Sequence, residues 1–474
     1  MTKNRMSKFL VVITALFLVL GTWAVPSQAQ KKPTWITHFG DWAKKSGNQD
    51  EVEWSNRLST PKALKLGQDW IDFLGYNAVD MVKKDIKKNN TAPSIKPGIT
   101  ITRENVAQYK NDLKGLIPDW QLQFIEGSGP YNNPREMEIV PTQHWYIQPG
   151  FLEATKKYHK ACSLNENSEL VGWTAGLPFP FPKGTPAEIA AQLCHDYDRL
   201  TIMGDNLNSL PMEFGLYGRD SKLERTEKAE LHWKNYSGRV TIDPKPNWPG
   251  KEDIMEKGCI VALYPYDLKG QALIRTRFKD LRKEDSFVAY VPSMRRIRRF
   301  TGSNTQDPLL GADISWEDWK GFWTKLSQTI HPRKFVLEGE GVYLCSSLNP
   351  KPIHYETKYG GQLRKARYER RPCWIVRIDN EDPNYIYGAR RMWVDKETFV
   401  FHYIEWYDQK GRLRLVWDWA WRMDPEKGEL DYWDPTIADL INKHSTYVKH
   451  DITLDMPNVS ENLFNLRFLS QRAH

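Results

Sequence analysis

Residues 412–423 read R-L-R-L-V-W-D-W-A-W-R-M, and large apolar side chains occupy every second position along this stretch. Successive side chains of a β-strand point to opposite faces, so the alternation predicts a strand. The apolar face would carry six side chains: Leu413, Leu415, Trp417, Trp419, Trp421 and Met423. The stretch therefore predicts one long β-strand with three indole rings aligned on a single face.

The same period of two recurs through the second half of the chain. Further strands are expected at residues 259–266, 271–278, 286–300, 335–346, 373–379, 385–394 and 399–407. The connections between them are as short as residues 267–270 (D-L-K-G) and 408–411 (D-Q-K-G), and such short turns force antiparallel neighbours. The second half therefore predicts a curved antiparallel sheet with few helices.

The first half is less regular and richer in helices. Apolar spacing indicates helices within residues 61–88 and 104–117. The clearest helix start is at Thr185, where Pro186 follows as the first helical residue and Glu188 completes a capping box. We therefore expect an α+β protein with a mixed helical and extended region at 30–215 and a sheet domain at 216–474, which can also form a single unit.

The aromatic face of 412–423 allows two interpretations. The sequence has 20 tryptophans, and aromatic side chains both fill cores and contact apolar ligands. The face is either packed beneath covering helices or forms the wall of an apolar cavity. In the second case the candidate ligand-binding residues are Leu415, Trp417, Trp419, Trp421 and Met423.

The N-terminus has the pattern of a secretory signal peptide. Lys3, Arg5 and Lys8 precede an uncharged apolar stretch at 9–25, and the small-residue pattern S-Q-A ends at Ala29. A membrane anchor is the alternative, but the apolar stretch is shorter than the roughly 20 residues that a spanning helix needs. We therefore expect residues 1–29 to be removed and the mature chain to enter the periplasm. No cysteine lies near the cleavage site, so a lipoprotein is not expected.

Charge and cysteine content narrow the possible functions. The formal net charge is +8, with residues of both signs mixed along the chain, so the sequence gives little support to nucleic-acid binding. The five cysteines are Cys162, Cys194, Cys259, Cys345 and Cys373, and no C-x-x-C motif occurs. An odd number leaves at least one cysteine outside any intramolecular disulfide, and spacing does not choose the pairs.

The sequence lacks the common catalytic motifs. We find no H-E-x-x-H, G-x-S-x-G, Walker A or G-x-G-x-x-G pattern. Cys194 and His195 are adjacent on an expected helix, so their side chains diverge by about 100°. His444 and His450 have no partners at metal-ligand spacing. No enzyme activity, metal or cofactor is therefore expected, although paired carboxylates for sugar hydrolysis stay open because their pairing depends on the fold.

Residues 293–300, S-M-R-R-I-R-R-F, concentrate four arginines: Arg295, Arg296, Arg298 and Arg299. Charges on both faces of a strand cannot all be buried without partners. One interpretation is structural, with ion pairs to Asp313, Glu317 or Asp318. The other is contact with an anion, such as a lipid headgroup, at the rim of a cavity.

Several segments together resemble a known family. Residues 286–323 contain Pro292, the run R-R-I-R-R at 295–299, Gly311, Asp313 and W-E-D at 316–318, a pattern similar to the outer membrane lipoprotein-sorting protein superfamily. Residues 96–106, 176–184 and 464–469 resemble, in the same order, the family called domain of unknown function 1329 within that superfamily. Its members are similar to the periplasmic lipoprotein carriers LolA and LolB.

The resemblance implies a curved antiparallel half-barrel, covered by helices and enclosing an apolar cavity. It implies a non-catalytic carrier of lipid or lipoprotein acyl chains, with an inner-membrane transporter and an outer-membrane protein as partners. Two alternatives remain open: a secreted carbohydrate-binding or carbohydrate-active protein, and a scaffold attached to a transporter. A carrier would enclose its indoles in a cavity, whereas a sugar-binding protein would present them on an open surface.

Overall fold

The computed structural model describes residues 33–472, except 90, 129–134, 201–203, 301–304, 433 and 457–458. The expected signal peptide, residues 1–29, lies outside the described residues. Along the described part of the chain, none of the helices combines the length and the apolar character that crossing a bilayer requires.

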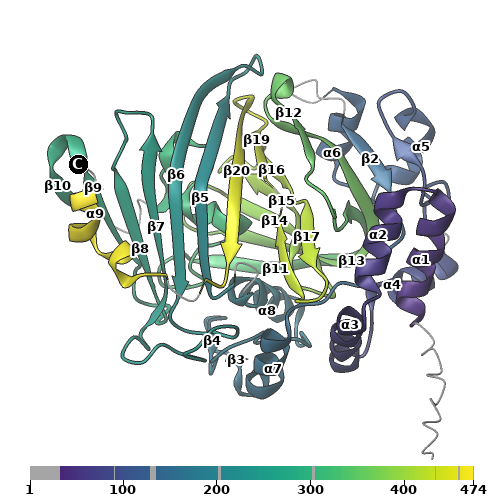
Figure 1. Ribbon diagram of the computed structural model, residues 1–474, viewed down its shortest axis with the longest axis horizontal. Coiled ribbons are helices and arrows are strands. Elements are labelled where there is room, and N and C mark those ends of the chain that lie inside the picture. Colours follow the sequence, from purple (N-terminus) through teal and green to yellow (C-terminus); the bar gives the residue numbers. More distant parts are fainter. Residues whose placement is uncertain are drawn as a thin grey trace, which may run out of the picture.

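One large, strongly curved sheet forms the body of the molecule (Figure 1). Its order is β1 (Thr100–Ile101), β2 (Glu136–Ile139), β13 (Gln362–Asn380), β14 (Ala389–Asp395), β15 (Phe401–Tyr407), β16 (Leu413–Asp418), β19 (Thr436–Asp439), β20 (His444–Leu454), β5 (Asn206–Tyr217), β6 (Leu223–Asn235), β7 (Ile254–Tyr264), β8 (Ala272–Phe278), β9 (Ser286–Val291) and β10 (Arg296–Phe300). Two further strands, β11 (Arg333–Ser346) and β12 (His354–Glu356), pair with β13.

The strand pairs are antiparallel apart from β2 with β13, and the order runs from β1 to β10 without closing among the described residues. The expected α+β class with an open, curved antiparallel sheet is therefore confirmed. The hairpin expected around residues 267–270 is present as β7 and β8. The sheet also draws β1, β2 and most of β5 from the expected N-terminal region, residues 30–215.

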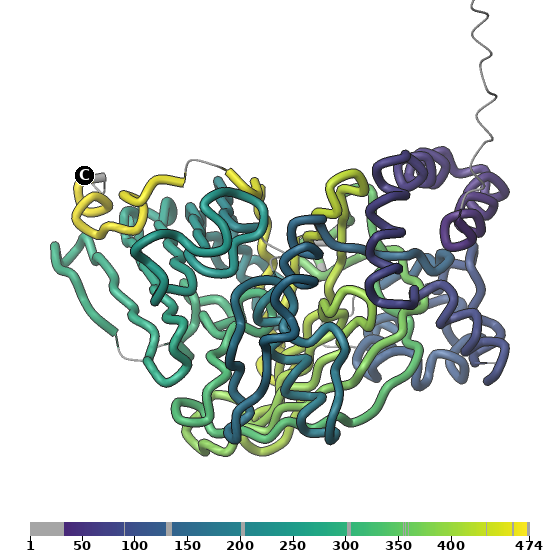
Figure 2. Tube along the Cα trace, turned by 90° about the horizontal axis from the view of Figure 1, so that it is seen from below, coloured from purple at the N-terminus to yellow at the C-terminus, as the bar shows by residue number. Residues whose placement is uncertain are grey.

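The first helices gather at the N-terminal end of the molecule, opposite the C-terminus (Figure 2). They are α1 (Thr34–Ser46), α2 (Gln49–Leu58), α3 (Pro61–Leu74), α4 (Ala78–Asn89), α5 (Val106–Leu113) and α6 (Asp119–Glu126). Later in the chain, α7 (Pro149–Tyr158) and α8 (Pro186–Arg199) lie elsewhere, and α9 (Leu466–Arg472) lies at the C-terminal end. The capping box of Thr185 and Glu188 starts α8 as expected. Helix α8 packs on β11 and β13, and α9 packs on β8 and β9.

The long strand expected at 412–423 is interrupted. Strand β16 ends at Asp418, and β17 (Trp421–Asp424) pairs with β18 (Glu429–Tyr432) in a separate two-stranded sheet. The rings of Trp417, Trp419 and Trp421 nevertheless stack in sequence, with centroids 4.0 and 5.4 Å apart. The expectation of one continuous strand was wrong because alternation records the face of a side chain, not the neighbour that shares its backbone hydrogen bonds.

The strand expected at 286–300 is a hairpin. A 3-10 turn, Pro292–Met294, separates β9 from β10, and Arg295 lies in the left-handed region with φ +48°. Proline has no backbone N–H to donate to a sheet ladder, which favours a turn at this position. In the hairpin, Arg298 stands directly opposite Ala289, and Phe300 opposite Phe287.

Residues 305–326, which we call the inner segment, fill the concave side of the sheet. The expected cap at Ser315 forms a capping box with Asp318, but the expected helix is only a 3-10 segment, Trp316–Gly321, broken at Trp319 and Lys320. The segment contacts both halves of the sheet. The ring centroids of Trp323 and of Trp233 in β6 are 4.2 Å apart. Oδ1 of Asp318 lies 2.7 Å from Nη2 of Arg390 in β14. We call the sheet face that it contacts the inner face.

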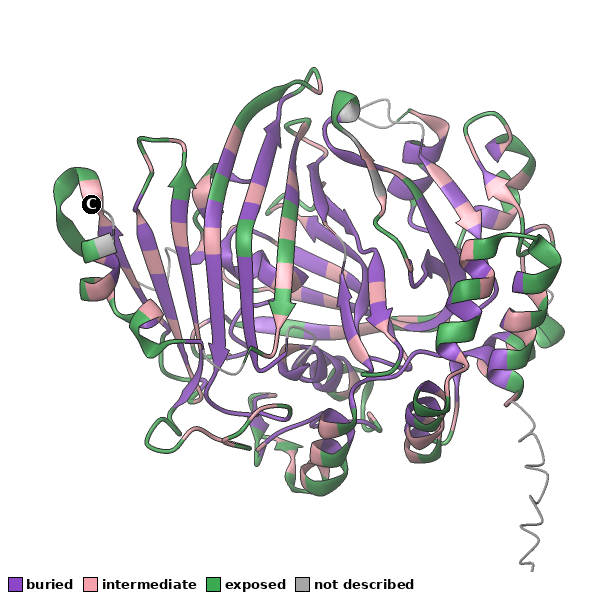
Figure 3. Cartoon of the chain, in the orientation of Figure 1, coloured by how far each residue is buried: buried purple, intermediate pink, exposed green. Residues whose placement is uncertain are grey.

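The distribution of buried and exposed residues matches this arrangement (Figure 3). The strands are buried along most of their length, and exposed residues collect at hairpin tips and on the N-terminal helices. The largest apolar cluster joins the inner face, the inner segment and α8, whereas α6 contributes to a separate cluster on the outer face. Each face of the sheet therefore has its own packed layer.

Candidate functional site

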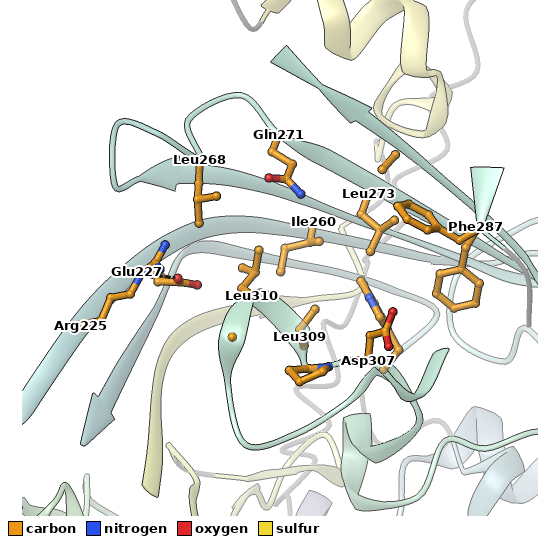
Figure 4. Close-up of a pocket in the computed structure, with 15 residues that line it drawn as sticks. Arg225, Glu227, Ile260, Leu268, Gln271, Leu273, Phe287, Asp307, Leu309 and Leu310 are labelled. Carbon is orange, nitrogen blue, oxygen red and sulfur yellow. Dashed lines mark ion pairs between the residues drawn. The ribbon is translucent and has the colours of Figure 1, made fainter. Parts of the chain in front are cut away.

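A pocket of about 330 Å³ lies between the inner segment and strands β6–β9 (Figure 4). Most of its wall is apolar, formed by Ile260, Leu268, Leu273, Phe287, Ala289, Phe300, Pro308, Leu309, Leu310 and Trp316. Its polar side chains are Arg225, Glu227, Gln271 and Asp307. A concave, mostly apolar space with a few polar groups is typical of a small-molecule site.

Strand register builds the sheet side of this pocket. Ile260 of β7 stands opposite Leu273 of β8, which stands opposite Ala289 of β9. Directly opposite residues share one face of a sheet, so alternate positions of three strands form one continuous apolar wall. Figure 4 shows Leu309 and Leu310 facing this wall from the inner segment.

A buried carboxylate lies in the same wall. The Oε1 atom of Glu227 is 2.7 Å from Nε of Arg225, and the glutamate is 1% exposed whereas the arginine side chain is 44% exposed. Burial raises the pKa of the Glu227 carboxyl, and Arg225 acts in the opposite direction. The pair therefore places a partly solvated guanidinium at the mouth of an apolar pocket.

The arginine run lies at the open edge of the sheet beside this pocket. Arg295, Arg296, Arg298 and Arg299 are all exposed. Because Arg298 stands opposite Ala289 and Phe300 opposite Phe287, Arg298 shares the inner face with two residues that line the pocket. Alternation puts Arg296 on this face as well and Arg299 on the other. Two guanidinium groups are thus on the same sheet face as the pocket.

The ion pairs expected for these arginines are not formed in the structure. Asp313 contacts His444 and Thr446, and Asp318 contacts Arg390. Glu317 accepts a hydrogen bond from Tyr385. The structural interpretation of the arginine run was therefore wrong in its partners, because the inner segment carries its acids into the core while β10 remains at the sheet edge.

Asp313 instead attaches the inner segment to β20. Its carboxylate oxygens lie 2.8 Å from Nδ1 of His444, and Thr446 donates a hydrogen bond of 2.7 Å to the same carboxylate. The backbone N–H of Asp313 donates to Oγ1 of Thr446 at 2.9 Å. The hydrogen bond to Asp313 raises the pKa of His444. Sequence spacing could not show this contact, because 131 residues separate the two partners.

The side chains expected to line a cavity lie in the packed core instead. Leu415, Trp417, Trp419, Trp421 and Met423 are all buried, and Trp417 borders a space of only about 10 Å³. The inner segment packs directly on this ladder, since a Cβ atom at Gly321 would lie 2.8 Å from the ring of Trp419. The structure therefore corrects the cavity-wall interpretation: these side chains belong to the packed core.

Sequence reasoning missed the residues that do line the pocket. Alternation in β7 and β8 marked Ile260 and Leu273 as strand residues, but gave no sign that they face an open space. Leu309 and Leu310 carried no pattern because they lie in an irregular loop with a 3-10 turn. Phe300, which directly follows the arginine run in the sequence, was a usable signal for the position of the pocket.

Solved structures with a similar arrangement come from several bacteria. A DUF1329 family protein from Desulfovibrio piger ATCC 29098 is 16% identical, covering 60% of this chain and 100% of that chain with a TM-score of 0.43. An outer membrane lipoprotein-sorting protein domain from Vibrio parahaemolyticus, described as putative in its name, is 18% identical (59% and 97%, TM-score 0.40). A LolA superfamily protein from Nitrosomonas europaea is 13% identical (60% and 98%, TM-score 0.35).

Similarity in sequence extends over more of the chain than the similarity to these solved structures. An uncharacterized protein from Pseudomonas aeruginosa is 23% identical over 427 residues, which cover 86% of this chain and 82% of that protein. Residues 100–465 match the family described as "Protein of unknown function (DUF1329)". This match includes the inner segment, the arginine run and every strand that lines the pocket. The chain therefore belongs to the DUF1329 family.

Proposed function

We propose that this protein is a non-catalytic periplasmic carrier for an amphiphile whose apolar chain occupies the pocket between the inner segment and β6–β9. The observation that carries the proposal is the pocket itself, about 330 Å³ with ten apolar side chains in its wall. Burying a methylene group stabilises binding by about 0.8 kcal/mol, so even a short acyl chain would contribute substantially before ordering costs.

Positive charge near the mouth of the pocket suits a ligand with an anionic headgroup. Arg225 lies at the mouth, and Arg296 and Arg298 stand on the inner face at the adjacent sheet edge. Arginine suits phosphate and carboxylate groups because its planar fork donates paired hydrogen bonds. A phospholipid or the acyl chains of a lipoprotein would match an apolar wall with a basic rim.

Transport to the outer membrane is the setting that we infer for this carrier. The signal-peptide pattern of residues 1–29, the lipoprotein-sorting name of one similar structure and the LolA superfamily name of another support it. An inner-membrane transporter would supply the ligand and an outer-membrane protein would receive it. The carbohydrate alternative has less support, because none of the tryptophans in the described residues is exposed.

A pocket-filling variant tests the proposal. Ala289 lies in the pocket wall, so Ala289→Leu should occupy part of the space and weaken binding of a fluorescent acyl probe at least several-fold. The control is Val288→Leu, which adds a methylene on the opposite face of the same strand. Binding is measured by probe titration and by native mass spectrometry of protein purified without detergent, and unfolding curves confirm that both variants fold.

The outcomes separate the three candidate functions. Equal binding by Ala289→Leu and wild type would place the ligand outside this pocket. Saturable binding of oligosaccharides without acyl ligands would favour the carbohydrate-binding protein. No binding of either class by the wild type would leave the transporter-attached scaffold.

A further inference from the structure

Three soft donor side chains meet on the outer face of the sheet, away from the pocket. They are Cys345 of β11, Cys373 of β13 and His402 of β15, and all three are fully buried. One potential ligand atom from each lies within 4.8 Å of the others. We propose that this cluster binds a thiophilic d10 metal ion, Zn²⁺ or Cu⁺.

The sulfur spacing fits a shared ion. Cys345 Sγ and Cys373 Sγ are 3.9 Å apart. Two thiolates on one tetrahedral zinc, each about 2.3 Å from the metal, would be about 3.8 Å apart. The two cysteines thus have the separation of metal ligands without any backbone movement. Thiolate and imidazole donors together suit zinc and monovalent copper rather than calcium or magnesium.

The histidine is oriented as metal-binding histidines are. His402 Nε2 lies 3.0 Å from Oδ2 of Asp395, whereas its Nδ1 has no hydrogen-bond partner among the described residues. A carboxylate on one ring nitrogen fixes the tautomer and leaves the lone pair of the other for a metal. Burial lowers the pKa of His402, although Asp395 acts to raise it, and a lowered pKa favours the neutral ring that metal binding requires.

The carboxylate behind the histidine is itself held in place. Arg371 lies 2.8 and 3.0 Å from the two oxygens of Asp395, and the backbone N–H groups of Glu397 and Thr398 donate to Oδ1. A fixed carboxylate of this kind would give the imidazole one orientation before any ion arrives.

Buried charged groups next to the cluster hold one another in place. Arg371 is the guanidinium shared by Glu369, Asp395 and Glu397, and all four side chains have no exposed area. A Zn²⁺ ion that displaces two thiol protons leaves the net charge of this region unchanged, and Cu⁺ lowers it by one, so ligand type and geometry favour the ion and not a need for positive charge.

Metal binding at this cluster would exchange protons for the ion. Burial raises the pKa of Cys345, which favours its thiol form in the metal-free protein. Each thiol that binds the ion becomes a thiolate and releases its proton to solvent. The bound ion would link β11, β13 and β15 beneath α6, whose Trp120 and Phe124 cover this face. The site is on the opposite face from the pocket and is independent of the proposed carrier function.

The test is metal retention by the full mature protein, reduced and stripped with chelator. Separate samples receive Zn²⁺, or Cu⁺ held by a chromogenic chelator, and are desalted before elemental analysis. We expect one equivalent of one of these ions, a rise in melting temperature, and loss of both effects in Cys345→Ala/Cys373→Ala. Cys259→Ala is the control, because Cys259 is equally buried outside the cluster.

A second measurement removes the dependence on a folded variant. Co²⁺ added to the wild type should give the thiolate-to-metal charge-transfer absorption that only a cysteine-bound ion produces, and Zn²⁺ should abolish it by displacement. Failure of the wild type to retain either ion or to give this absorption would overturn the proposal. Equal retention by the double variant, or a Cys345–Cys373 disulfide in the protein as isolated, would overturn it as well.

Discussion

At the residue scale, Gly321 shows how closely the inner segment approaches the sheet. Its φ is +79°, and an added Cβ would lie 2.4 Å from Cδ1 of Ile404 and 2.8 Å from the ring of Trp419. Both the backbone conformation and the contact therefore exclude a side chain. The tryptophan ladder can be covered only because this position is glycine.

Gly321→Ala should therefore destabilise the protein by about 2–4 kcal/mol, combining overpacking with left-handed strain. Gly411→Ala is the matched control, because Gly411 has φ +75° but no atom within 4 Å of the added Cβ. The control should lose only about 1 kcal/mol, the cost of the backbone conformation alone. Urea unfolding of both variants measures the difference, and equal losses would contradict the close packing.

Trp419→Ala tests whether the ladder is core or ligand wall. Trp419 is 1% exposed and stacks between Trp417 and Trp421. Removing the indole should cost about 3–5 kcal/mol of stability by cavity formation, with acyl-probe affinity nearly unchanged. Trp419→Phe, which keeps an aromatic ring, should lose less. A variant that unfolds like wild type but fails to bind the probe would restore the ladder as the ligand wall.

At the scale of elements, strand β10 separates its arginines by face. Arg296→Gln/Arg298→Gln removes the inner-face pair, and Arg299→Gln on the opposite face is the control. Exposed substitutions usually change stability by less than about 0.5 kcal/mol, so the melting temperature should stay close to wild type in all cases. The double variant should weaken binding of an anionic amphiphile and leave an uncharged one of equal chain length unaffected.

Two results would contradict the expected role of Arg296 and Arg298. A large loss of stability in Arg296→Gln/Arg298→Gln would mean that the pair has a structural role after all. Equal weakening by Arg299→Gln would assign the effect to general surface charge.

The contact of Asp313 with His444 makes the attachment of the inner segment pH-dependent. Asp313 raises the pKa of His444 above its usual value of about 6.5. A raised folded-state pKa adds stability that is fully present below the unfolded value and is lost as the pH rises through the folded value. Stability from this contact should therefore be highest below about pH 6.5 and decline on the alkaline side.

Urea unfolding as a function of pH measures this effect, with His444→Gln as the comparison. The wild type should lose stability relative to His444→Gln as the pH rises from about 6 to 8. Acyl-probe dissociation should quicken over the same range, because the attached loop carries Leu309 and Leu310 of the pocket wall. Parallel pH profiles for the two proteins would exclude His444 as the titrating group.

At the scale of the whole molecule, the N-terminal helices hold the turn between β14 and β15. Trp70 Nε1 donates to the carbonyl of Glu397 at 2.9 Å, and the backbone N–H of Ala78 donates to its carboxylate at 2.8 Å. Tyr76 OH donates to the carbonyl of Lys396 at 2.6 Å. These buried contacts bridge more than 300 residues of sequence.

We therefore expect the described regions on both sides of residue 215 to unfold together. Calorimetry of the mature protein should give one transition, and a fragment of residues 216–474 should not fold, since it lacks β1, β2, α8 and most of β5. Two resolved transitions, or a folded fragment with native tryptophan fluorescence, would show that the sheet domain is autonomous.

The sequence by itself determined the class of the structure. Alternation at 412–423 and in the runs of the second half predicted antiparallel strands, because a strand has to place successive side chains on opposite faces. The start of α8 followed from Thr185, Pro186 and Glu188, since a cap uses neighbours in the chain. Residues 96–106, 176–184 and 464–469 also showed the resemblance to the DUF1329 family that the family match confirms.

Tertiary structure alone decided where ligand and metal could bind. The break after Asp418 depends on which strand accepts the next hydrogen bonds, and the open pocket depends on where the inner segment stops filling the sheet. Cys345, Cys373 and His402 come from three strands and meet on the outer face, although Cys345 stands opposite Glu369 and Cys373 opposite Gly341 in the sheet. Local spacing carries no record of register between distant strands, and that register decided which face was packed and which space was left open.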